Sequence, residues 1–265
     1  MRIAVVGHVE WVEFARVERV PAPGDIVHAL ETWQEPAGGG AVAAVQLANL
    51  GAETTLFTAF GGDELGERSR EELTRHGVRV EAPALAEPTR RAFTFVDDEG
   101  ERTITVLGDK LPPRGPLEGL GGFEAVYFVS GDVAALRSAR EAPLLVAAAR
   151  DLPTLRAARV EVDVLIGSGT DPAERYVPGD LDPAPPLVVR TAGATGGTLE
   201  PGGPYLAVEP QGTIADSYGC GDCFAAAFTF AIARGDSPQA AAQLGARCGA
   251  AVLTGAGPYA GQLRV

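Results

Sequence analysis

Lysine is almost missing from this 265-residue sequence, and cysteine and histidine are scarce. Lys110 is the only lysine, which excludes any mechanism that needs two lysine side chains. The three cysteines are an odd number, and this argues against a disulfide framework. Cys220 and Cys223 have the spacing of a redox or metal pair, but zinc would need two further ligands and the three histidines are scattered. We therefore expect the cysteines to be small buried side chains.

Long apolar runs and an excess of positive charge are also lacking. No stretch approaches the roughly 18 uninterrupted apolar residues of a membrane-spanning helix. The apolar run at residues 3–6 is too short for a signal peptide, so we expect a cytoplasmic protein. The formal net charge is −13, whereas nucleic acids and anionic membranes are bound through basic patches. Neither is expected as a partner.

What is present is a regular alternation of strand-like and helical segments, and 46% of the residues are hydrophobic. This alternation predicts βαβ units with a parallel sheet, in one domain spanning residues 1–265. Predicted strands cover residues 3–6, 54–60, 125–129, 144–147, 164–166 and 187–190. Predicted helices cover residues 40–50, 64–76, 134–140, 152–158, 223–233 and 238–253. Gly51 and Gly77 suit helix C-termini, and Ser237 with Pro238 suits an N-terminus.

Two segments, residues 17–35 and 91–107, interrupt the alternation with β-like patterns. The second contains two strand-like runs around the turn 97–100, which predicts a hairpin. Such strands do not easily join a parallel sheet. We expect a small accessory sheet with strands from about 12–35 and 89–108, covering the carboxyl ends of the main strands as a lid. Its exposed edges predict a homodimer through the lid.

The segment 216–222, Asp-Ser-Tyr-Gly-Cys-Gly-Asp, precedes a small apolar helical stretch. Gly219 and Gly221 permit a tight turn whose N–H groups, at a helix N-terminus, would attract an anion. Asp222 would stand beside them as a base for an attacking hydroxyl. The alternative is structural, because Asp often caps helices and Gly-x-Gly often only connects elements. The local pattern alone favours the structural alternative.

Five motifs in order resemble the ribokinase (PfkB) family of carbohydrate kinases over nearly the full length. They are the glycines 38–40 with the helix ending at Leu50-Gly51, the turn 60–66 (Phe-Gly-Gly-Asp-Glu-Leu-Gly), the Pro88-Thr89 hairpin with residues 100–103 (Gly-Glu-Arg-Thr), Thr191-Ala192-Gly193 with Gly196-Gly197, and the segment 216–222. Each motif alone is weak evidence, but five in order are specific. The resemblance implies a three-layer α/β/α fold with a mostly parallel sheet and a small β-sheet lid.

The resemblance also implies transfer of the γ-phosphate of ATP to a hydroxymethyl group of a sugar or sugar-like acceptor. Asp222 would be the catalytic base, and the amides of Gly219, Cys220 and Gly221 would form the anion hole. Mg²⁺ is implied by the ATP phosphates. Asp216 lies where many family members bind a monovalent cation such as K⁺.

The remaining predicted site residues divide into two groups. The nucleotide side would contain Thr191, Gly193 and Gly196, with Tyr259 capping the adenine or else closing the core. The acceptor side would contain Gly38 and Gly39, with Glu10 and with Trp11, which we expect to face the sugar rather than the core. Arg90 and Arg91 would bind a phosphorylated sugar or lie on the solvated surface. His8 is expected to be structural.

Several positions depart from the family pattern. Val42 and Val12 stand where the family has a sugar-binding Asn and Asp, and a buried hydroxyl without a partner costs about 1–3 kcal/mol. These valines argue against a standard ribose site. The family's Asn-x-x-Glu, which organises Mg²⁺, falls on residues 168–171, so Asp171 or Glu174 would supply the acid. Ala246 replaces an Asn near the adenine.

Three alternatives accompany the sugar-kinase interpretation. A nucleoside kinase would use the same chemistry on a larger acceptor. A nucleotide- or metabolite-binding protein with weak or lost catalysis would fit the altered residues 168–171 and Val42. A Rossmann dehydrogenase is disfavoured, because residues 7–10 (Gly-His-Val-Glu) replace the G-x-G-x-x-G that should follow the first strand.

Overall fold

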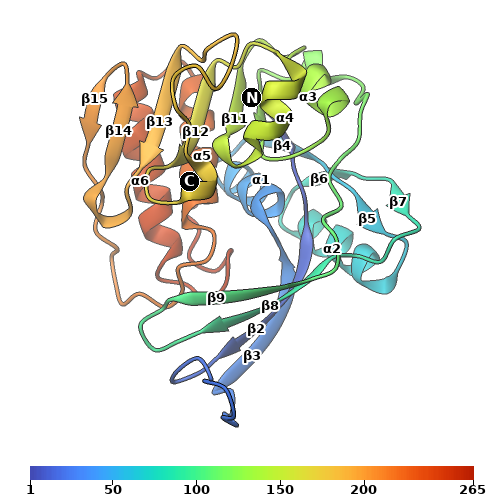
Figure 1. Cartoon of the computed structure of the whole chain (residues 1–265), viewed down its shortest axis with the longest axis vertical. Helices are drawn as coiled ribbons and strands as arrows, with labels where there is room; N and C mark the ends of the chain where they lie inside the picture. Colours follow the sequence, from blue (N-terminus) through green and yellow to red (C-terminus); the bar gives the residue numbers. More distant parts are fainter.

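A nine-stranded sheet forms the centre of the computed structural model, which describes residues 1–265 (Figure 1). Its strands, in spatial order, are β15 (Gly203–Tyr205), β14 (Gly197–Glu200), β13 (Leu187–Thr191), β12 (Val164–Ser168), β11 (Leu145–Ala148), β10 (Ala125–Phe128), β1 (Arg2–Val6), β4 (Glu53–Phe57) and β6 (Arg79–Glu81). The strands from β13 to β6 are parallel, while β14 and β15 are antiparallel. The predicted mostly parallel sheet is confirmed.

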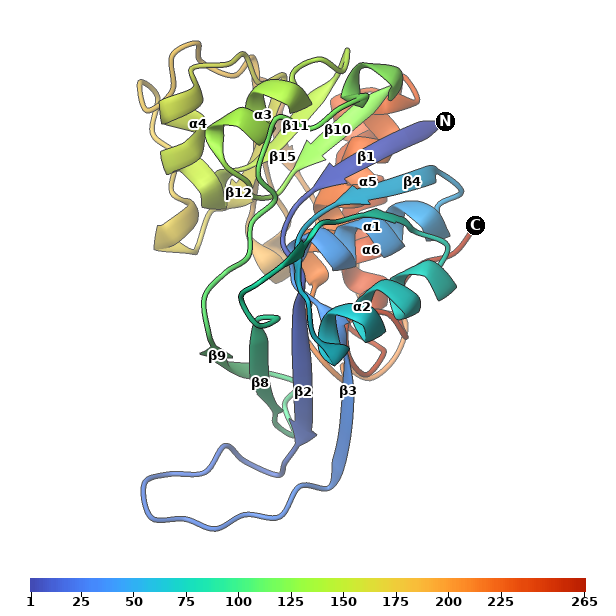
Figure 2. The same ribbon diagram turned by 90° about the vertical axis from the view of Figure 1, so that its right-hand side faces the viewer.

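Helices cover both faces of this sheet, as Figure 2 shows. On one face lie α1 (Gly39–Asn49), α2 (Glu64–Arg75), α5 (Cys220–Ala233) and α6 (Pro238–Val252), and on the other lie α3 (Val133–Ala139) and α4 (Leu152–Ala158). A 43-residue apolar cluster fills the first side and a 21-residue cluster the second. The three-layer α/β/α prediction is therefore confirmed. No helix combines the length and apolar character needed to cross a bilayer.

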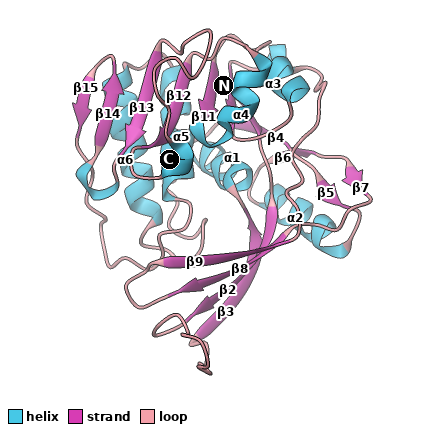
Figure 3. Cartoon of the chain, in the orientation of Figure 1, coloured by secondary structure: helices cyan, strands magenta, loops and turns pink.

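A separate four-stranded sheet projects from the carboxyl ends of the central strands (Figures 2 and 3). Its order is β3 (Glu31–Ala37), β2 (Glu10–Arg16), β8 (Arg91–Val96) and β9 (Arg102–Leu107). The β8–β9 hairpin is antiparallel, whereas β2 and β8 pair in parallel, with Trp11 opposite Arg91. All residues of β9 are exposed, so this strand is a free edge.

This small sheet is tied to the rest of the molecule at two points. Asp63 caps α2 by accepting the N–H of Gly66, and it also accepts the N–H and hydroxyl of Thr89 at 2.8 and 2.5 Å. The turn at residues 60–66, through Asp63, thus anchors the chain just before β8. At the hairpin turn, Arg102 Nη1 donates to the carbonyl and hydroxyl oxygens of Ser217.

Several boundaries differ from the sequence predictions. Residues 17–30 contain no strand, and the first strand of the small sheet begins at Glu10, slightly before the expected start at about residue 12. The two-stranded sheet of β5 (Phe60–Gly61) and β7 (Ala84–Leu85) separates Phe60 from β4. Helix α5 starts at Cys220 instead of residue 223, because Gly219 takes the left-handed conformation (φ 79°) and caps it.

Candidate active site

The first turn of α5 presents free backbone donors next to a carboxylate. Gly219 is the N-cap, so the amides of Cys220 and Gly221 have no helical acceptor, and none is supplied elsewhere by the backbone. A side chain built at Gly221 would meet no protein atom within 4 Å, so the space before the turn is open. Asp222 lies in the same turn. The arrangement suits an anion beside a base.

The Asp222 carboxylate rests directly on the start of α1. A Cβ added at Gly39 would lie 2.8 Å from Asp222 Oδ1 and 2.9 Å from Val129 Cγ1. Only glycine leaves room for both groups at this position. Desolvation, followed by the charge of Glu174, raises the pKa of Asp222 to about 6. A carboxylate with this pKa is ionised at neutral pH and basic enough to take a proton.

Glu10 belongs to a buried polar network that joins β2 to Gly38 and the 216–222 segment. Its carboxylate is 6% exposed, and Oε1 accepts the Tyr218 hydroxyl at 3.4 Å. The Tyr218 oxygen in turn accepts the N–H of Gly38 at 3.3 Å. Glu10 Oε2 lies 3.1 Å from Arg90 Nε, but the two groups are not aligned for a hydrogen bond. Three predicted site positions, Glu10, Gly38 and the 216–222 segment, are thereby joined.

His8 ends the turn that leaves β1. Its Nδ1 lies 3.1 Å from the Ser130 hydroxyl, and its ring packs against Gly38. Burial, together with the charges of Lys110, Arg90 and Arg150, holds the pKa of His8 well below its ordinary value. The ring is therefore neutral, in agreement with a structural histidine.

The predicted nucleotide-side residues lie at the carboxyl ends of β12 and β13. Thr191 ends β13 opposite Ser168, and Gly193 and Gly196 form the turn into β14. A Cβ at Gly196 would lie 2.2 Å from the Tyr205 carbonyl oxygen, so this glycine is required for the turn itself.

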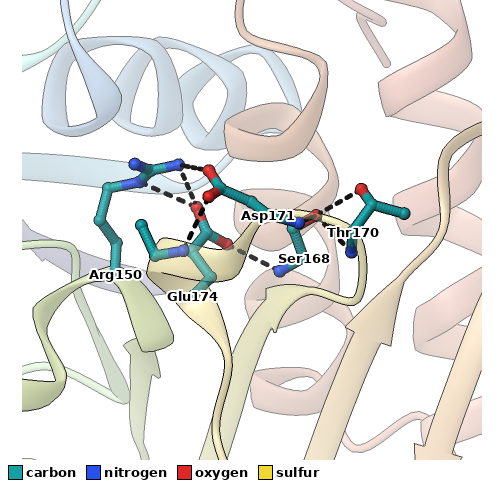
Figure 4. Close-up of polar contacts among 6 residues, drawn as sticks. Arg150, Ser168, Thr170, Asp171 and Glu174 are labelled. Atoms are coloured by element: carbon teal, nitrogen blue, oxygen red, sulfur yellow. Dashed lines mark hydrogen bonds and ion pairs between the residues drawn. The ribbon is translucent and has the colours of Figure 1, made fainter.

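An acidic pair lies beside this turn (Figure 4). Asp171 and Glu174 each contact Arg150 Nη2 at 2.6 Å, and Glu174 also accepts the N–H of Ser168. No three His, Cys, Asp or Glu side chains converge as a metal cluster. The two carboxylates nevertheless meet around one cation, the guanidinium, and hard oxygen donors of this kind suit Mg²⁺.

Two predicted site residues lie in the core instead. Successive strand residues face opposite sides, so Trp11 points away from Glu10. Its side chain is 1% exposed, and Arg68 of α2 stacks 4.3 Å from its ring. Tyr259 is 4% exposed, its hydroxyl donates to the Pro36 carbonyl, and its ring packs on His76. Neither has surface left for a sugar or an adenine, so the core alternative describes both.

Asp216 anchors the loop that leads into α5. It is 1% exposed, and its two carboxylate oxygens accept the N–H groups of Tyr218 and Gly257. Glu35 approaches Gly257 from the small sheet and accepts the Trp33 indole N–H at 3.0 Å. Burial, reinforced by the charges of Glu72 and Asp216, raises the pKa of Glu35 to about 7.

This raised pKa predicts pH-dependent stability. The unfolded chain releases the Glu35 proton near its ordinary pKa of 4.5, whereas the fold keeps it up to about pH 7, so stability falls as pH rises between these values. Glu35→Gln should raise Tm at pH 8 by about 3–6 °C, since one pKa unit is worth about 1.4 kcal/mol and solvent access reduces the effect. At pH 5 the two proteins should unfold almost together.

Thermal unfolding at both pH values is the measurement, with Glu31→Gln, an exposed glutamate on the same strand, as the matched control. An equal Tm change at pH 5 and pH 8 would show that Glu35 does not hold its proton in the fold.

A cavity of about 580 Å³ lies away from these residues, over the face of β4 and β6 opposite α1. Its lining includes Arg2, Glu81 and Arg114 and none of the predicted site residues. Tyr218 and Arg150 were not among the predicted site residues, although both contact them. Tyr218 contacts Gly38 and Glu10, 180 and 208 positions earlier, and Arg150 contacts Asp171 and Glu174, 21 and 24 positions later, so no local pattern marks these contacts.

Comparison with known proteins agrees with this architecture. The model of the pfkB family of carbohydrate kinases matches residues 1–111 and 177–263. An ATP-dependent ribose-1-phosphate kinase of Halopiger xanaduensis is 30% identical over 279 residues, covering 94% of this chain and 91% of that protein.

Solved structures show the same fold. Ribokinase from Thermotoga maritima superimposes with a TM-score of 0.78 at 20% identity, covering 100% of this chain and 96% of that one. The nucleoside kinase of Methanocaldococcus jannaschii gives 0.76 at 18% identity, covering 99% and 95%. With the family model matched over most of its length, the chain belongs to the pfkB family of carbohydrate kinases, phosphotransferases with the ribokinase fold.

Proposed function

We propose that this kinase transfers the γ-phosphate of ATP to a hydroxymethyl group of a sugar, with Asp222 as the base. The acceptor oxygen attacks the γ-phosphorus while its proton passes to Asp222. The bond to the β–γ bridging oxygen breaks, and ADP leaves with that electron pair. The observation that carries the proposal is the Asp222 carboxylate, held against Gly39 in the same helical turn as two unengaged amides.

The anion hole is assigned to the turn formed by Gly219, Cys220 and Gly221. Free N–H groups at the N-terminus of a 14-residue helix stabilise the negative charge on the phosphoryl group as it is transferred. Gly38 and Gly39 would border the acceptor, since both lie against the network of Glu10, Tyr218 and Asp222.

The nucleotide is assigned to the carboxyl ends of β12 and β13, with Thr191, Gly193 and Gly196 along the turn. Asp171 and Glu174 would hold Mg²⁺ beside this turn, and bound Mg²⁺ neutralises the charge of the ATP phosphates. A monovalent cation beside Asp216 stays a prediction, since both oxygens of that carboxylate already accept backbone N–H groups.

The acceptor is proposed to be a phosphorylated pentose. Support comes from the Halopiger xanaduensis relative, which is named for ribose 1-phosphate and matches nearly the whole chain. Val12 and Val42, both fully buried, offer no partner to a neutral hydroxyl. A nucleoside kinase is the second candidate, favoured only by the fold shared with a nucleoside kinase.

We further propose one domain over residues 1–265, in which the small sheet acts as the lid, and a homodimer formed through it. The free edge at β9 supports pairing with a second copy. ATP dependence and three unpaired cysteines support a cytoplasmic location.

ADP release tests the function. With ATP and Mg²⁺, we expect ribose 1-phosphate to give rapid ADP formation, with nucleosides and unphosphorylated pentoses much slower. Mass spectrometry of the product verifies phosphate transfer, since it should show one added phosphoryl group on the acceptor. Fastest turnover with a nucleoside would replace the proposal with the second candidate, and no acceptor-dependent ADP would refute both.

A further inference from the structure

Arg90 is an arginine whose hydrogen-bonding capacity is almost unused. Its side chain is 15% exposed, at the junction between the small sheet and the central sheet, where its carbonyl oxygen accepts the N–H of Trp11. Its only charged partner is Glu10, and Nε is buried without an aligned acceptor. Neither terminal nitrogen donates to any protein acceptor. A guanidinium has five N–H donors. When the group is nearly buried and none of these donors is hydrogen-bonded, its desolvation costs free energy that a bound ligand would offset.

Lys110, the only lysine, also lacks a partner. It lies in the segment that leaves β9 and returns to the central sheet (Figure 2), and it forms no ion pair or hydrogen bond. Its ammonium group is at the surface, yet desolvation by the surrounding protein lowers its pKa, and the charge of Arg90 lowers it further. Lys110 and Arg90 therefore lie within electrostatic reach of each other and of His8, whose pKa both also lower.

The acidic groups nearby are largely engaged elsewhere. Asp151 accepts the N–H of Gly131 and the hydroxyl of Thr154, and Glu10 accepts the hydroxyl of Tyr218. Asp171 and Glu174 neutralise Arg150. Lys110 has none of these carboxylates as a direct partner, and Arg90 has only the misaligned Glu10.

We propose that Arg90 and Lys110 form the binding site for the phosphate monoester of the acceptor sugar. The terminal nitrogens of Arg90 would hold two phosphate oxygens as a fork, and Lys110 would add a point charge from the segment after β9. Glu10 would orient the guanidinium through Nε, leaving the terminal nitrogens for the phosphate. The inference rests on the proposed function, and it makes these two side chains the determinants of a phosphorylated over a free sugar.

Two substitutions test it. Arg90→Lys keeps the charge opposite buried Glu10 but removes the fork, and Lys110→Gln changes an exposed residue that forms no hydrogen bond or ion pair, so both should fold. Calorimetric titration of each protein with ribose 1-phosphate, without ATP, should show binding weakened about 10–100-fold. Arg91→Gln is the matched control, because Arg91 is exposed and pairs loosely with Glu13 at 3.9 Å. It should bind as the wild type does.

Turnover provides the second measurement. Both variants should raise KM for ribose 1-phosphate about 10-fold or more and leave KM for ATP and the slow reaction with ribose unchanged. Equal losses with both sugars, or wild-type affinity in both variants, would overturn the inference while leaving the kinase assignment intact. Tight, Arg90-dependent binding without ADP formation would support the inference and refute the proposed reaction.

Discussion

Asp222→Asn is expected to lower kcat by about 10²–10⁴-fold while the fold and the affinity for ATP are retained, since asparagine fills the same space but cannot accept the acceptor's proton. Asp222 touches Gly39 and lies beside two free amides, so an isosteric change leaves those contacts in place. The expected loss falls on the chemical step. Steady-state ADP release with saturating ATP and acceptor measures it.

The pH dependence of the rate is a second test of Asp222 as the base. With a pKa of about 6, Asp222 loses its basic form as pH falls below that value, so wild-type kcat/KM should decline below about pH 6 and level off above it. The residual activity of Asp222→Asn should lack this acid limb. Asp98→Asn, an exposed carboxylate at the hairpin turn, should leave both rate and profile unchanged. A folded Asp222→Asn protein with wild-type kcat would remove Asp222 from the mechanism.

Gly39→Ala is expected to lower kcat/KM by about 100-fold. The added Cβ would lie 2.8 Å from Asp222 Oδ1 and 2.9 Å from Val129 Cγ1, distances that real Cβ atoms essentially never show. The carboxylate or the start of α1 must move, and displacement of a catalytic group by about 1 Å can cost about 10²-fold. Initial rates with the acceptor varied at fixed ATP would show the loss.

Gly122→Ala provides the comparison for this variant. Its Cβ would meet only Arg2 Nη1, at an ordinary contact distance of 3.5 Å, so activity should be unchanged. Circular dichroism separates a local effect from unfolding. If Gly39→Ala keeps full activity, the Asp222 carboxylate does not need its position against Gly39.

The parts of the fold that could be predicted from sequence are those set by local chemistry. Ser237 before Pro238 marks the start of α6, and Gly51 and Gly77, both with positive φ, end α1 and α2. The small sheet was expected from about residue 12, but the start of β2 at Glu10 and its pairing could not be predicted in this way. Its residues pair with β8, about 80 positions later, and that partner is invisible to a local pattern.

The candidate site also contains residues that local sequence could indicate and residues whose position depends on distant parts of the chain. The turn in the 216–222 segment could be predicted because its glycines carry the geometry locally. Its role as a site was predicted only from five motifs in order, because the local pattern favoured a structural role. Trp11 was expected to face the sugar instead of the core, yet alternation along β2 turns it towards Arg68. For Arg90, binding of a phosphorylated sugar and a solvated surface position beside Arg91 both stayed open in the sequence, since burial against Glu10 depends on how two sheets meet.

The parallel pairing of β2 with β8 has an evolutionary consequence. The small sheet is not one insertion: the chain enters it after β1, leaves it into α1, and enters it again after α2. No single deletion could remove it, and no single transplanted segment could supply it. In the proposed acceptor site, the residues that decide acceptor preference are therefore encoded in two separate stretches of the gene, one around codon 10 and one around codons 90–110.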